Sequence, residues 1–525
     1  MSHNLHYFHR AWIQSDPRTL EAEVCVYGGT SAGVVAAVAA ARRGRTVILL
    51  QPGLHLGGMT SGGLGWTDYG QKHVIGGMSR QFYRDLGKFT NTDEQWHFEP
   101  HAAEQTYRAM LDDVDLKVFK AQYLDKVQMD GKRIASVTCL GGLTVKAHAF
   151  VDVTYEGDLM ARAGVSYTVG RESNDTYGEK LNGVQVRHHH QFSHPVDPYV
   201  EAGNPQSGTL PYVNPDDAAP QGSGDHRIQA YCFRVCMTDK PDLRVPWAKP
   251  ADFDPRLYVL ATRWFNSDKD EYNEVLRADG SMAKFDRLGV KHKTDTNNHG
   301  PISSDFIGAN YAWPEADYIT REKIFQQHVS YQQGYYWHMA NDPAIPDRYR
   351  EAYSQWGLAR DEFEDTGHWP HQLYVREARR MVADHVLTEA DCRHERTCDD
   401  PVGMGSYNMD SHNCQRIVRD GRVLNEGDVQ VAPAGPYGIS YKCIVPKRGE
   451  CENLAVPVCC STSHICYGSV RMEPVFMILG ESAALAIDLA LRDGAALQDV
   501  PYDALRPELD QAGQVVELPS EAGAV

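Results

Sequence analysis

The chain has 525 residues, 42% of them hydrophobic and 23% charged, which is enough to bury a large core in about two to three domains. Its 70 carboxylates outnumber its 52 lysines and arginines, and the net charge of −18 makes a nucleic-acid backbone or an anionic membrane surface an unfavourable partner. The first residues show no basic stretch followed by an apolar one, and we find no apolar run of transmembrane length. We therefore expect a cytoplasmic protein without membrane insertion, and an exported form that has been processed is left open.

The cysteine and histidine spacings predict no metal site. The twelve cysteines include no C-x-x-C pair, which argues against a zinc site or an iron–sulfur cluster, and we expect most of them to be reduced and buried. His188, His189, His190 and His194 form a histidine-rich tract. Consecutive side chains point in different directions, however, and no acidic residue is spaced to complete a metal site.

The first predicted elements are a strand, a tight turn, a helix and a second strand. Residues 24–27 form a short apolar run that ends at Gly28 and Gly29. Residues 32–41 are small and indicate a helix, and residues 46–50 are apolar again. This order is typical of a unit that binds a nucleotide at the turn between its first strand and its helix.

The turn departs at two positions from the dinucleotide-binding pattern G-x-G-x-x-G. Gly28 and Gly33 hold the outer positions, where they allow the tight turn and the close packing of helix on strand. Thr30 replaces the middle glycine, so we expect Gly29 to give the close backbone approach and the Thr30 hydroxyl to donate to phosphate. Gln51 replaces the acidic residue that binds the ribose, and its amide can still bond a hydroxyl. An ordinary βαβ unit with a glycine-rich turn is the alternative.

A second glycine-rich segment follows at residues 55–68, HLGGMTSGGLGWTD, with five glycines in fourteen residues. No core strand or helix tolerates so many, whereas a loop that brings main-chain amides close to a ligand uses them. A nicotinamide dinucleotide needs no second wrap of this kind, but a flavin dinucleotide, which binds in an extended conformation, does. The two segments together favour a flavin.

The next segments alternate between helix and strand patterns. Residues 74–112 show helical spacing, after which the apolar period changes to two over residues 115–154. Hairpin turns at 130–131 and 141–142 predict a β-meander there. Residues 166–400 are loop-rich, aromatic and polar, as expected for a substrate domain whose side chains line a polar cavity. A loop-rich folded domain without such a cavity is the alternative.

Near the C-terminus, an apolar strand is predicted at residues 453–460, and a helix rich in alanine, leucine and isoleucine follows Pro474. Proline suits the first helical turn because its missing N–H has no helical partner there. A helix start presents free N–H groups and the positive end of a dipole. It is therefore the electrostatic partner that an anionic reduced flavin needs.

Six segments, taken in chain order, resemble one known family. They are VYGGTSAGVVAAVAAARRG, LGGMTSGGLG, VDVTYEGDLMARAGV, QLYVREARRM, YNMDSH and STSHICYGSVRMEPVFMILGESAALA. Together they are similar to the FAD-dependent oxidoreductases, including xanthan-lyase-like members, and more distantly to the flavoprotein subunits of fumarate reductase and succinate dehydrogenase. The resemblance covers most of the chain, is specific for the FAD-binding part and indicates no substrate.

The resemblance implies an α/β fold with FAD as cofactor. A Rossmann-like FAD-binding domain with a β-meander crossover is expected from residues 1–165 and 401–525, with a mixed α+β substrate domain, residues 166–400, inserted between them. The first glycine turn is expected at the pyrophosphate, the second along the ribityl chain and isoalloxazine, and the C-terminal helix start at the pyrimidine edge. The residues expected to bind FAD are Gly28, Gly29, Thr30, Ser31, Ala32, Gly33, Gln51, Gly57, Gly58, Met59, Thr60, Ser61, Gly62, Gly63, Arg471, Met472, Glu473 and Pro474.

Oxidation of an alcohol by a flavin requires a base for the hydroxyl proton while hydride leaves the same carbon. His464 is the first candidate and His412 the second, each expected on a short polar break beside a flavin-binding element. A hydrogen-bonded structural role is the alternative for both. Arg376, Arg379 and Arg380 lie at helical spacing and are candidates for holding a substrate carboxylate or sugar oxygens. Ion pairs between domains are the alternative for the arginines.

These patterns predict an FAD-dependent oxidoreductase that abstracts hydride from a secondary alcohol of a sugar- or polyol-like small molecule. An unknown electron acceptor then reoxidises the flavin. The first alternative is fumarate-reductase-like dehydrogenation or reduction of a C–C bond in a carboxylate substrate, and the second is a flavin-binding protein without turnover. Association into a homo-oligomer is left open.

Overall fold

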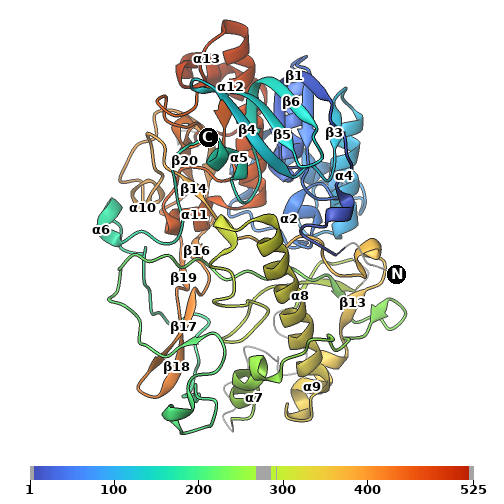
Figure 1. Cartoon of the computed structure of the whole chain (residues 1–525), viewed down its shortest axis with the longest axis vertical. Coiled ribbons are helices and arrows are strands. Elements are labelled where there is room, and N and C mark those ends of the chain that lie inside the picture. The colour runs from blue at the N-terminus through green and yellow to red at the C-terminus, as the bar shows by residue number, and fades with distance from the viewer. Residues whose placement is uncertain (1–4, 268–284, 291, 519–525) are drawn as a thin grey trace, which may run out of the picture.

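The computed structural model describes residues 5–267, 285–290 and 292–518 (Figure 1). A large sheet with packed helices fills the upper half of the view, and a loop-rich part around helix α8 (Tyr318–Asn341) fills the lower half. Segments near both chain ends, blue and red in Figure 1, lie together in the upper half. The N-terminal nucleotide-binding unit is therefore completed by residues that follow it by more than 300 positions.

The large sheet joins N-terminal strands with one short C-terminal strand. Its order is β3-β2-β1-β6-β5-β4, and β21 pairs with the second half of β6. β3, β2, β1, β6 and β21 run parallel, whereas β4, β5 and β6 form an antiparallel meander. The strands are β1 (Thr19–Tyr27), β2 (Val47–Leu50), β3 (Lys117–Phe119), β4 (Leu124–Asp130), β5 (Arg133–Cys139), β6 (Thr144–Asp152) and β21 (Leu454–Ala455). The predicted Rossmann-like fold with a β-meander is confirmed.

The C-terminal strand is shorter than predicted. Only Leu454 and Ala455 of the apolar run 453–460 pair with β6. Pro457 follows two residues later and has no N–H to donate to a ladder, so the run cannot continue as a central strand. The apolar residues after it are still buried, although they pair with no strand.

Two helices, α1 (Ser31–Arg42) and α12 (Glu473–Asp493), pack tightly together against the sheet. α1 consists almost entirely of alanine, valine and glycine, whose small side chains allow close approach. At the contact, a Cβ added to Gly480 would lie 2.5 Å from the carbonyl oxygen of Ala32. The two backbones therefore meet without an intervening side chain.

Helix α12 is long and apolar enough to cross a membrane by length and composition, with a mean hydropathy of 1.7 over its most apolar window. The expectation that the sequence contains no apolar run of transmembrane length is therefore wrong. The chemical reason for the composition is burial, since 89% of that window lies inside the protein. A helix that is covered on all sides needs apolar residues around its whole circumference.

Further helices and small sheets complete the chain. The N-terminal helices are α2 (Gly58–Ser61), α3 (Gly77–Gly87), α4 (Pro100–Asp112) and α5 (Asp158–Arg162). The later ones are α6 (Asn174–Tyr177), α7 (Val259–Phe265), α9 (Asp347–Ser354), α10 (Glu389–Cys392), α11 (His464–Val470) and α13 (Tyr502–Gln511). α3 and α4 fall within the segment predicted to be helical.

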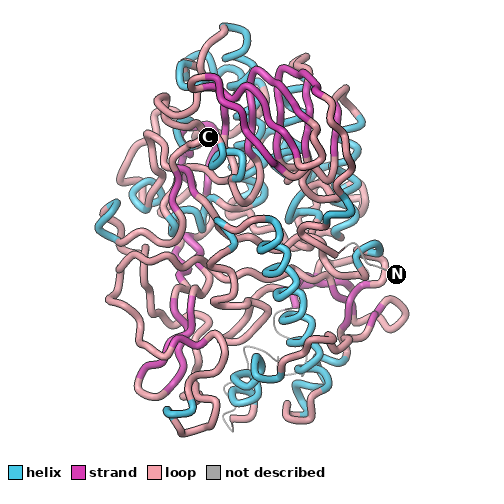
Figure 2. The backbone as a smooth tube through the Cα atoms, in the orientation of Figure 1, coloured by secondary structure: helices cyan, strands magenta, loops and turns pink. Residues whose placement is uncertain are grey.

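The part between residues 166 and 400 is built mostly of loops, drawn pink in Figure 2. Its main sheet has the order β10-β13-β9-β12-β11. These strands are β9 (Met237–Thr238), β10 (Arg244–Val245), β11 (Phe285–Arg287), β12 (Lys293–Thr296) and β13 (Gly357–Ala359). The mixed α+β character expected of this part is confirmed, whereas the domain boundaries near 165 and 400 stay a prediction.

The remaining strands form short pairs, of which β8 with β17 links this part to the C-terminal part of the chain. The strands are β7 (Tyr167–Thr168) with β14 (Arg380–Met381), β15 (Pro401–Gly405) with β20 (Tyr437–Ser440), β16 (Met409–Ser411) with β19 (Val429–Val431), and β17 (Gln415–Arg419) with β18 (Arg422–Glu426) and β8 (Val213–Asn214). The prediction that Arg376, Arg379 and Arg380 lie on a helix is wrong, because Arg380 belongs to strand β14, which pairs with β7. Residues 375–379 are instead irregular and lead into β14, so their side chains project in different directions.

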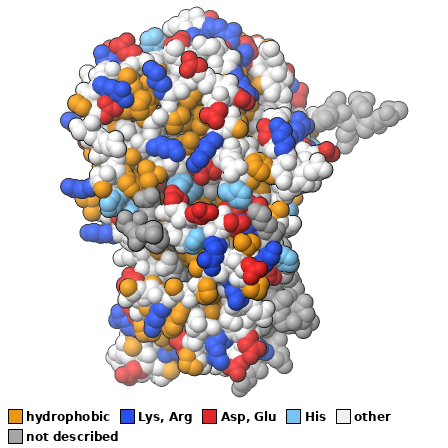
Figure 3. Space-filling model, turned by 90° about the vertical axis from the view of Figure 1, so that its right-hand side faces the viewer, with side chains coloured by type: hydrophobic (Ala, Val, Ile, Leu, Met, Phe, Trp, Pro, Cys, Tyr) orange, Lys and Arg blue, Asp and Glu red, His pale blue; other side chains and the backbone are white. Residues whose placement is uncertain are grey.

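The surface in Figure 3 mixes acidic, basic and hydrophobic side chains without a single dominant charged patch on the face shown. All twelve cysteines are unbridged, and eleven of them are buried. The predicted burial of the cysteines is thus confirmed.

Gly480→Ala is expected to lower the free energy of unfolding by about 1–3 kcal/mol, because the new methyl group meets the backbone of Ala32. Thermal melting checks this. Gly449→Ala is the matched control, since a Cβ at Gly449 meets no atom within 4 Å. Equal melting temperatures for the two variants would contradict the close contact between α1 and α12.

Candidate active site

The first glycine turn is held against the end of β6. Gly28 has φ +109°, and a Cβ there would lie 2.9 Å from Thr154 N. A Cβ at Gly33 would overlap the carbonyl oxygen of Gly28, so α1 packs directly on the turn. Thr30 caps α1: its hydroxyl accepts from Gly33 N at 3.3 Å and donates to the Val153 carbonyl at 2.7 Å. In this structure the Thr30 proton is thus directed at Val153, which differs from the predicted donation to phosphate.

Gln51 stands at the end of β2, where its side-chain carbonyl accepts a hydrogen bond from Gly29 N at 2.6 Å. It lines a cleft at the carboxyl edge of the parallel strands, the edge at which open α/β sheets bind dinucleotides. On the sheet side the cleft is lined by Gly28, Gly29, Thr30, Gln51, Tyr155 and Glu156. On the opposite side it is lined by Phe325 of α8 and residues 371–373.

The second glycine segment lies directly on the first. Gly57, with φ +95°, donates its N–H to the Gly29 carbonyl at 2.7 Å and forms a parallel bridge with Thr30. Helix α2 follows, and a Cβ at Gly63 would overlap the Arg234 carbonyl oxygen. Close backbone contact therefore explains Gly28, Gly33 and Gly63, whereas Gly29, Gly57 and Gly58 leave room for neighbouring side chains.

Glu473 brings the second glycine segment and the start of α12 together. Its carboxylate accepts hydrogen bonds from Thr60 Oγ1 at 2.9 Å and from the Tyr155 hydroxyl at 2.8 Å. Tyr155 in turn accepts from Met59 N at 2.8 Å. Burial raises the pKa of Glu473, and the three hydroxyl donors around it, the third being Ser31, oppose that rise. The predicted cofactor segments around residues 30, 60 and 473 thus meet in one place.

The cleft fits a bound FAD. The N-terminus of α1 opens at the glycine turn, and no acidic side chain occupies its first turn, so the positive end of its dipole has no anionic partner on the helix itself. Gly28 and Gly29 leave no side chain between this helix start and the cleft. An FAD pyrophosphate would be held by this turn, the ribose near Gln51, and the flavin end toward α2 and the start of α12.

Arg379 and Arg380 are occupied by buried carboxylates. Arg379 pairs with Asp158 at 2.9 Å, and Arg380 pairs with Glu172 at 2.7 Å and with Glu377 at 3.0 Å. These contacts join the middle part of the chain to the sheet end and to β14. The contacts of Arg379 and Arg380 are therefore ion pairs within the chain, the alternative stated for the arginines, and they leave no open site for a substrate carboxylate.

His464 is held on both ring nitrogens. It is the first residue of α11, a helix capped by Ser463 Oγ, rather than part of the polar break that the sequence suggests. Its Nδ1 lies 2.8 Å from a Glu377 oxygen and its Nε2 lies 3.1 Å from Ser411 Oγ. With 2% of its surface exposed, His464 belongs to the same buried network as Glu377 and Arg380.

His412 follows β16 and has one nitrogen bonded and one not. Its Nδ1 lies 2.8 Å from Asp305 Oδ2, whereas its Nε2 lies 3.6 Å from Asp410 Oδ2, beyond hydrogen-bond range. The main-chain N–H of His412 donates to Gln229 Oε1 at 3.1 Å. Sequence reasoning missed Asp305 and Asp410, although Asp410 stands two residues before His412 in MDSH.

Two arginines border the same group. Arg376 Nη2 lies 2.9 Å from Asp305 Oδ1, and Arg471 donates to the Tyr374 hydroxyl at 2.7 Å and to Asp410 at 3.0 Å. Both guanidinium groups lie over the Tyr374 ring, at 4.7 and 5.6 Å from its centre. We call Asp305, Tyr374, Arg376, Asp410, His412 and Arg471 the polar cluster. Arg471 directly precedes the start of α12, so the cluster adjoins the expected flavin end.

Several buried polar atoms at the polar cluster have no hydrogen-bond partner within the described part of the chain. They are Gln229 Nε2, Asn310 Oδ1, Arg376 Nε and Arg471 Nε. Each such atom costs about 1–3 kcal/mol if nothing meets it. The set includes donors and an acceptor, so a ligand or water with hydroxyl groups can satisfy both kinds.

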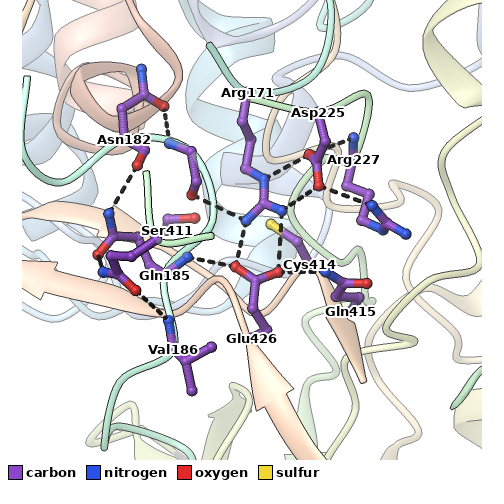
Figure 4. Close-up of polar contacts among 12 residues, drawn as sticks. Arg171, Asn182, Gln185, Val186, Asp225, Arg227, Ser411, Cys414, Gln415 and Glu426 are labelled. Atoms are coloured by element: carbon purple, nitrogen blue, oxygen red, sulfur yellow. Dashed lines mark hydrogen bonds and ion pairs between the residues drawn. The ribbon is translucent and has the colours of Figure 1, made fainter. Parts of the chain in front are cut away.

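A second buried network, shown in Figure 4, supports the segment after His412. Arg171 donates to Asp225 at 2.9 and 2.6 Å and to Glu426 at 2.7 Å. Glu426 also accepts from Gln185 N at 2.7 Å, and its carbonyl accepts from Cys414 N at 2.7 Å. The strands β17 and β18 are thereby tied to residues 171–225, which fixes the position of the preceding histidine.

Two groups of residues that could be considered for metal binding have partners within the chain. Glu99, His101 and Glu362 lie close enough to ligate a metal ion, but Lys293 Nζ lies between them, 2.7 Å from Glu99 and 2.6 Å from Glu362. In the histidine-rich tract, His190 bonds Asp428 at 2.9 Å. The expected absence of a metal stays a prediction.

FAD affinity is expected to fall as pH rises through about 7. Burial raises the pKa of Glu156 to about 7, although the Arg321 guanidinium opposes that rise. Below this pH the carboxyl group is neutral, and above it an anion lines the cleft expected to hold the pyrophosphate. Fluorescence titration of the apoprotein should show about two- to tenfold weaker binding at high pH.

Glu156→Gln is expected to remove this pH dependence, because its amide stays neutral throughout. Glu21→Gln, at an exposed position on β1, is the matched control and should keep the wild-type slope. If FAD affinity fell with pH equally in Glu156→Gln and in the wild type, Glu156 would not be the group that causes the pH dependence.

Comparisons with known proteins support FAD binding at the level of the family. The family model described as FAD dependent oxidoreductase matches residues 23–509. No individual curated protein matches the chain.

Solved structures give remote similarities. Mycobacterium smegmatis Sdh1 in complex with UQ1 is 13% identical, with a TM-score of 0.24 over 30% of this chain and 42% of that one. L-proline dehydrogenase from P. horikoshii is 14% identical, with a TM-score of 0.25 over 30% of this chain and 59% of that one. A 3-ketosteroid-delta4-(5alpha)-dehydrogenase from Rhodococcus jostii RHA1 is 15% identical, with a TM-score of 0.20 over 27% and 48%. The chain thus spans about half the length of these proteins.

The family match extends from the middle of β1 to the end of α13, so it includes the sheet, the inserted part and the helix that returns to the sheet. The matched stretch also contains the nucleotide-binding turn, the second glycine segment and the start of α12, which lie together in the structure. The chain belongs to the FAD-dependent oxidoreductase family.

Proposed function

We propose that the protein oxidises a secondary alcohol of a sugar- or polyol-like small molecule, with His412 as the base that accepts the hydroxyl proton. Bound FAD supplies the hydride acceptor. The observation that carries the proposal is the His412–Asp305 pair, placed beside buried polar atoms that have no hydrogen-bond partner. In this step the substrate C–H bond breaks and the hydride leaves for the flavin. The hydroxyl proton moves to His412 Nε2, and a carbonyl forms.

The choice of His412 over His464 rests on their second nitrogens. A base needs an unoccupied lone pair within reach of the proton that it accepts. Nε2 of His464 lies at hydrogen-bond distance from Ser411, whereas Nε2 of His412 is separated from Asp410 by 3.6 Å. Asp305 on Nδ1 orients the His412 ring and stabilises the imidazolium formed on proton transfer. We therefore assign His464 a positioning role.

The polar cluster supports a hydroxylated substrate. Gln229 Nε2 and Arg376 Nε are donors, and Asn310 Oδ1 is an acceptor. A polyol offers both donors and acceptors along its length, which are the two kinds of partner that these atoms lack. Arg379 and Arg380 are engaged by carboxylates of the chain, which leaves them unavailable to a substrate carboxylate.

One observation favours the carboxylate alternative. Arg416 on β17 is buried and has no carboxylate within ion-pair distance in the described part of the chain, and burial lowers its pKa. Its guanidinium donates to the Pro301 carbonyl at 3.4 Å and also bonds the side chain of Tyr331, which is not a carboxylate. A buried guanidinium without an anion is costly, and a substrate carboxylate would neutralise it. A carboxylate substrate, oxidised at a C–C bond, is therefore the second candidate.

Anaerobic mixing of the holoenzyme with sugars, polyols and dicarboxylates tests the substrate class, with bleaching of the oxidised flavin absorbance as readout. Reduction by hydroxylated compounds without carboxylates supports the proposal. Reduction by a dicarboxylate without a hydroxyl group, lost in Arg416→Leu, would establish the second candidate instead.

His412→Ala is expected to slow flavin reduction by about a hundred- to several-thousandfold, the usual contribution of a general base, while FAD stays bound. His226→Ala, at an exposed position, is the control with an unchanged rate. His464→Ala should chiefly lower the melting temperature, because it removes a partner of buried Glu377. A wild-type reduction rate in His412→Ala, with the true substrate, would exclude this histidine as the base.

A further inference from the structure

His371 stands in the wall of the cofactor cleft with both ring nitrogens unused. It lines the cleft opposite Gly29 and Gln51, on the segment that covers the cleft from the middle part of the chain. Both nitrogens are buried, and neither has a hydrogen-bond partner among the described residues. A buried imidazole without partners is unusual enough to require an explanation.

His55 holds the His371 ring in place. The two rings are stacked, with centres 3.9 Å apart and planes inclined by 12°. His55 Nε2 lies 3.1 Å from Asp365 and its Nδ1 lies 3.6 Å from Glu104. Burial acts to lower the pKa of His55, but the two carboxylates outweigh it and raise the pKa to about 9. His55 is therefore a cation at neutral pH.

His371 is neutral beside this cation. Burial and the positive charge of His55 both lower its pKa well below the ordinary value. A neutral imidazole offers one N–H donor and one bare acceptor nitrogen. His371 thus brings one donor and one acceptor without partners to the cleft wall, on a ring that stacks on His55.

We propose that His371, backed by His55, binds the adenosine half of FAD. The position decides which half: Gln51 directly follows β2, and in this fold the residue at the end of the second strand faces the adenosine ribose. The ribose hydroxyls and the adenine ring both offer a donor and an acceptor, which match the two nitrogens of His371. This inference concerns cofactor binding and does not depend on the proposed alcohol oxidation.

The consequence is that residues 371–373 and Phe325 close the cleft over the adenosine, so the middle part of the chain contributes to FAD affinity. The sequence offers no local signal for this role, because His371 lies more than 300 residues after the glycine turn. His55 is the first residue of the second glycine segment, so the stacked rings join that segment to the middle part of the chain.

His371→Phe tests the proposal, because phenylalanine keeps the stack on His55 and removes both nitrogens. Binding to the apoprotein is measured by fluorescence titration with FAD and by competition with ADP, which carries only the adenosine and phosphate groups. We expect both affinities to fall by the same factor of about ten or more, the equivalent of one or two lost hydrogen bonds. His371→Gln, which restores a donor and an acceptor, should recover binding to within about threefold of wild type.

His226→Phe makes the same chemical change at an exposed position away from the cleft and should bind as wild type. Melting of each apoprotein verifies that it is folded. Unchanged FAD affinity in His371→Phe, or weaker FAD binding with unchanged ADP binding, would overturn the proposal. Since no substrate is present, these outcomes are independent of whether His412 is the base.

Discussion

The pairing of Asp158 with Arg321 sets how the middle part of the chain faces the sheet. Asp158 follows β6, and Arg321 stands in the first turn of α8, with two hydrogen bonds of 2.6 and 2.9 Å between them. Burial acts to raise the pKa of Asp158, but Arg321 and Arg379 lower it to about 2, so it is ionised at neutral pH. Removing either partner would leave an uncompensated buried charge, at a cost of about 3–5 kcal/mol.

Because this pair fixes the start of α8, it also places the wall of the cofactor cleft. Phe325 lies one helical turn after Arg321 and lines the cleft opposite the glycine turn. The same contact involves Arg379, which leads into β14, so the segment that carries His371 to Arg380 is positioned from one end by Asp158. The cofactor cleft and the polar cluster thus depend on one buried carboxylate.

The sequence predicted the local elements and not the tertiary contacts, for physical reasons. Gly28, Thr30 and Gly33 shape a turn within six residues, and Pro474 marks a helix start by its own covalent structure, so both can be recognised without knowing the fold. His464 was expected in a polar break because its neighbours are small and polar, yet Ser463 caps a helix there. Ser463 Oγ accepts a hydrogen bond from Cys466 N, three residues later, as an N-cap serine does. A serine at this position is the signal that could have identified α11.

Other features depend on partners that are distant in the chain. The spacing of Arg376, Arg379 and Arg380 suits a helix, but each guanidinium has a different buried carboxylate as partner, and an irregular backbone lets the three diverge. The partners Asp305, Asp158 and Glu172 are separated from them by 71 to more than 200 residues. No periodicity within the segment records such contacts, so only the histidine and the arginines of the polar cluster could be indicated by the sequence.

A buried network of this kind adds little net stability, since the desolvation of each charge offsets most of its attraction to a partner. Its effect is to hold side chains in one arrangement. His464 is held by Glu377 and Ser411, and Ser411 directly precedes His412, so the network that occupies one histidine orients the other. Preorganised dipoles and charges around His412 need not reorganise when a proton arrives, which is how such a site lowers a barrier. The proposed base His412 and the positioning residue that we assign at His464 are therefore connected through one network, and they differ in whether Nε2 is within hydrogen-bond distance of a partner.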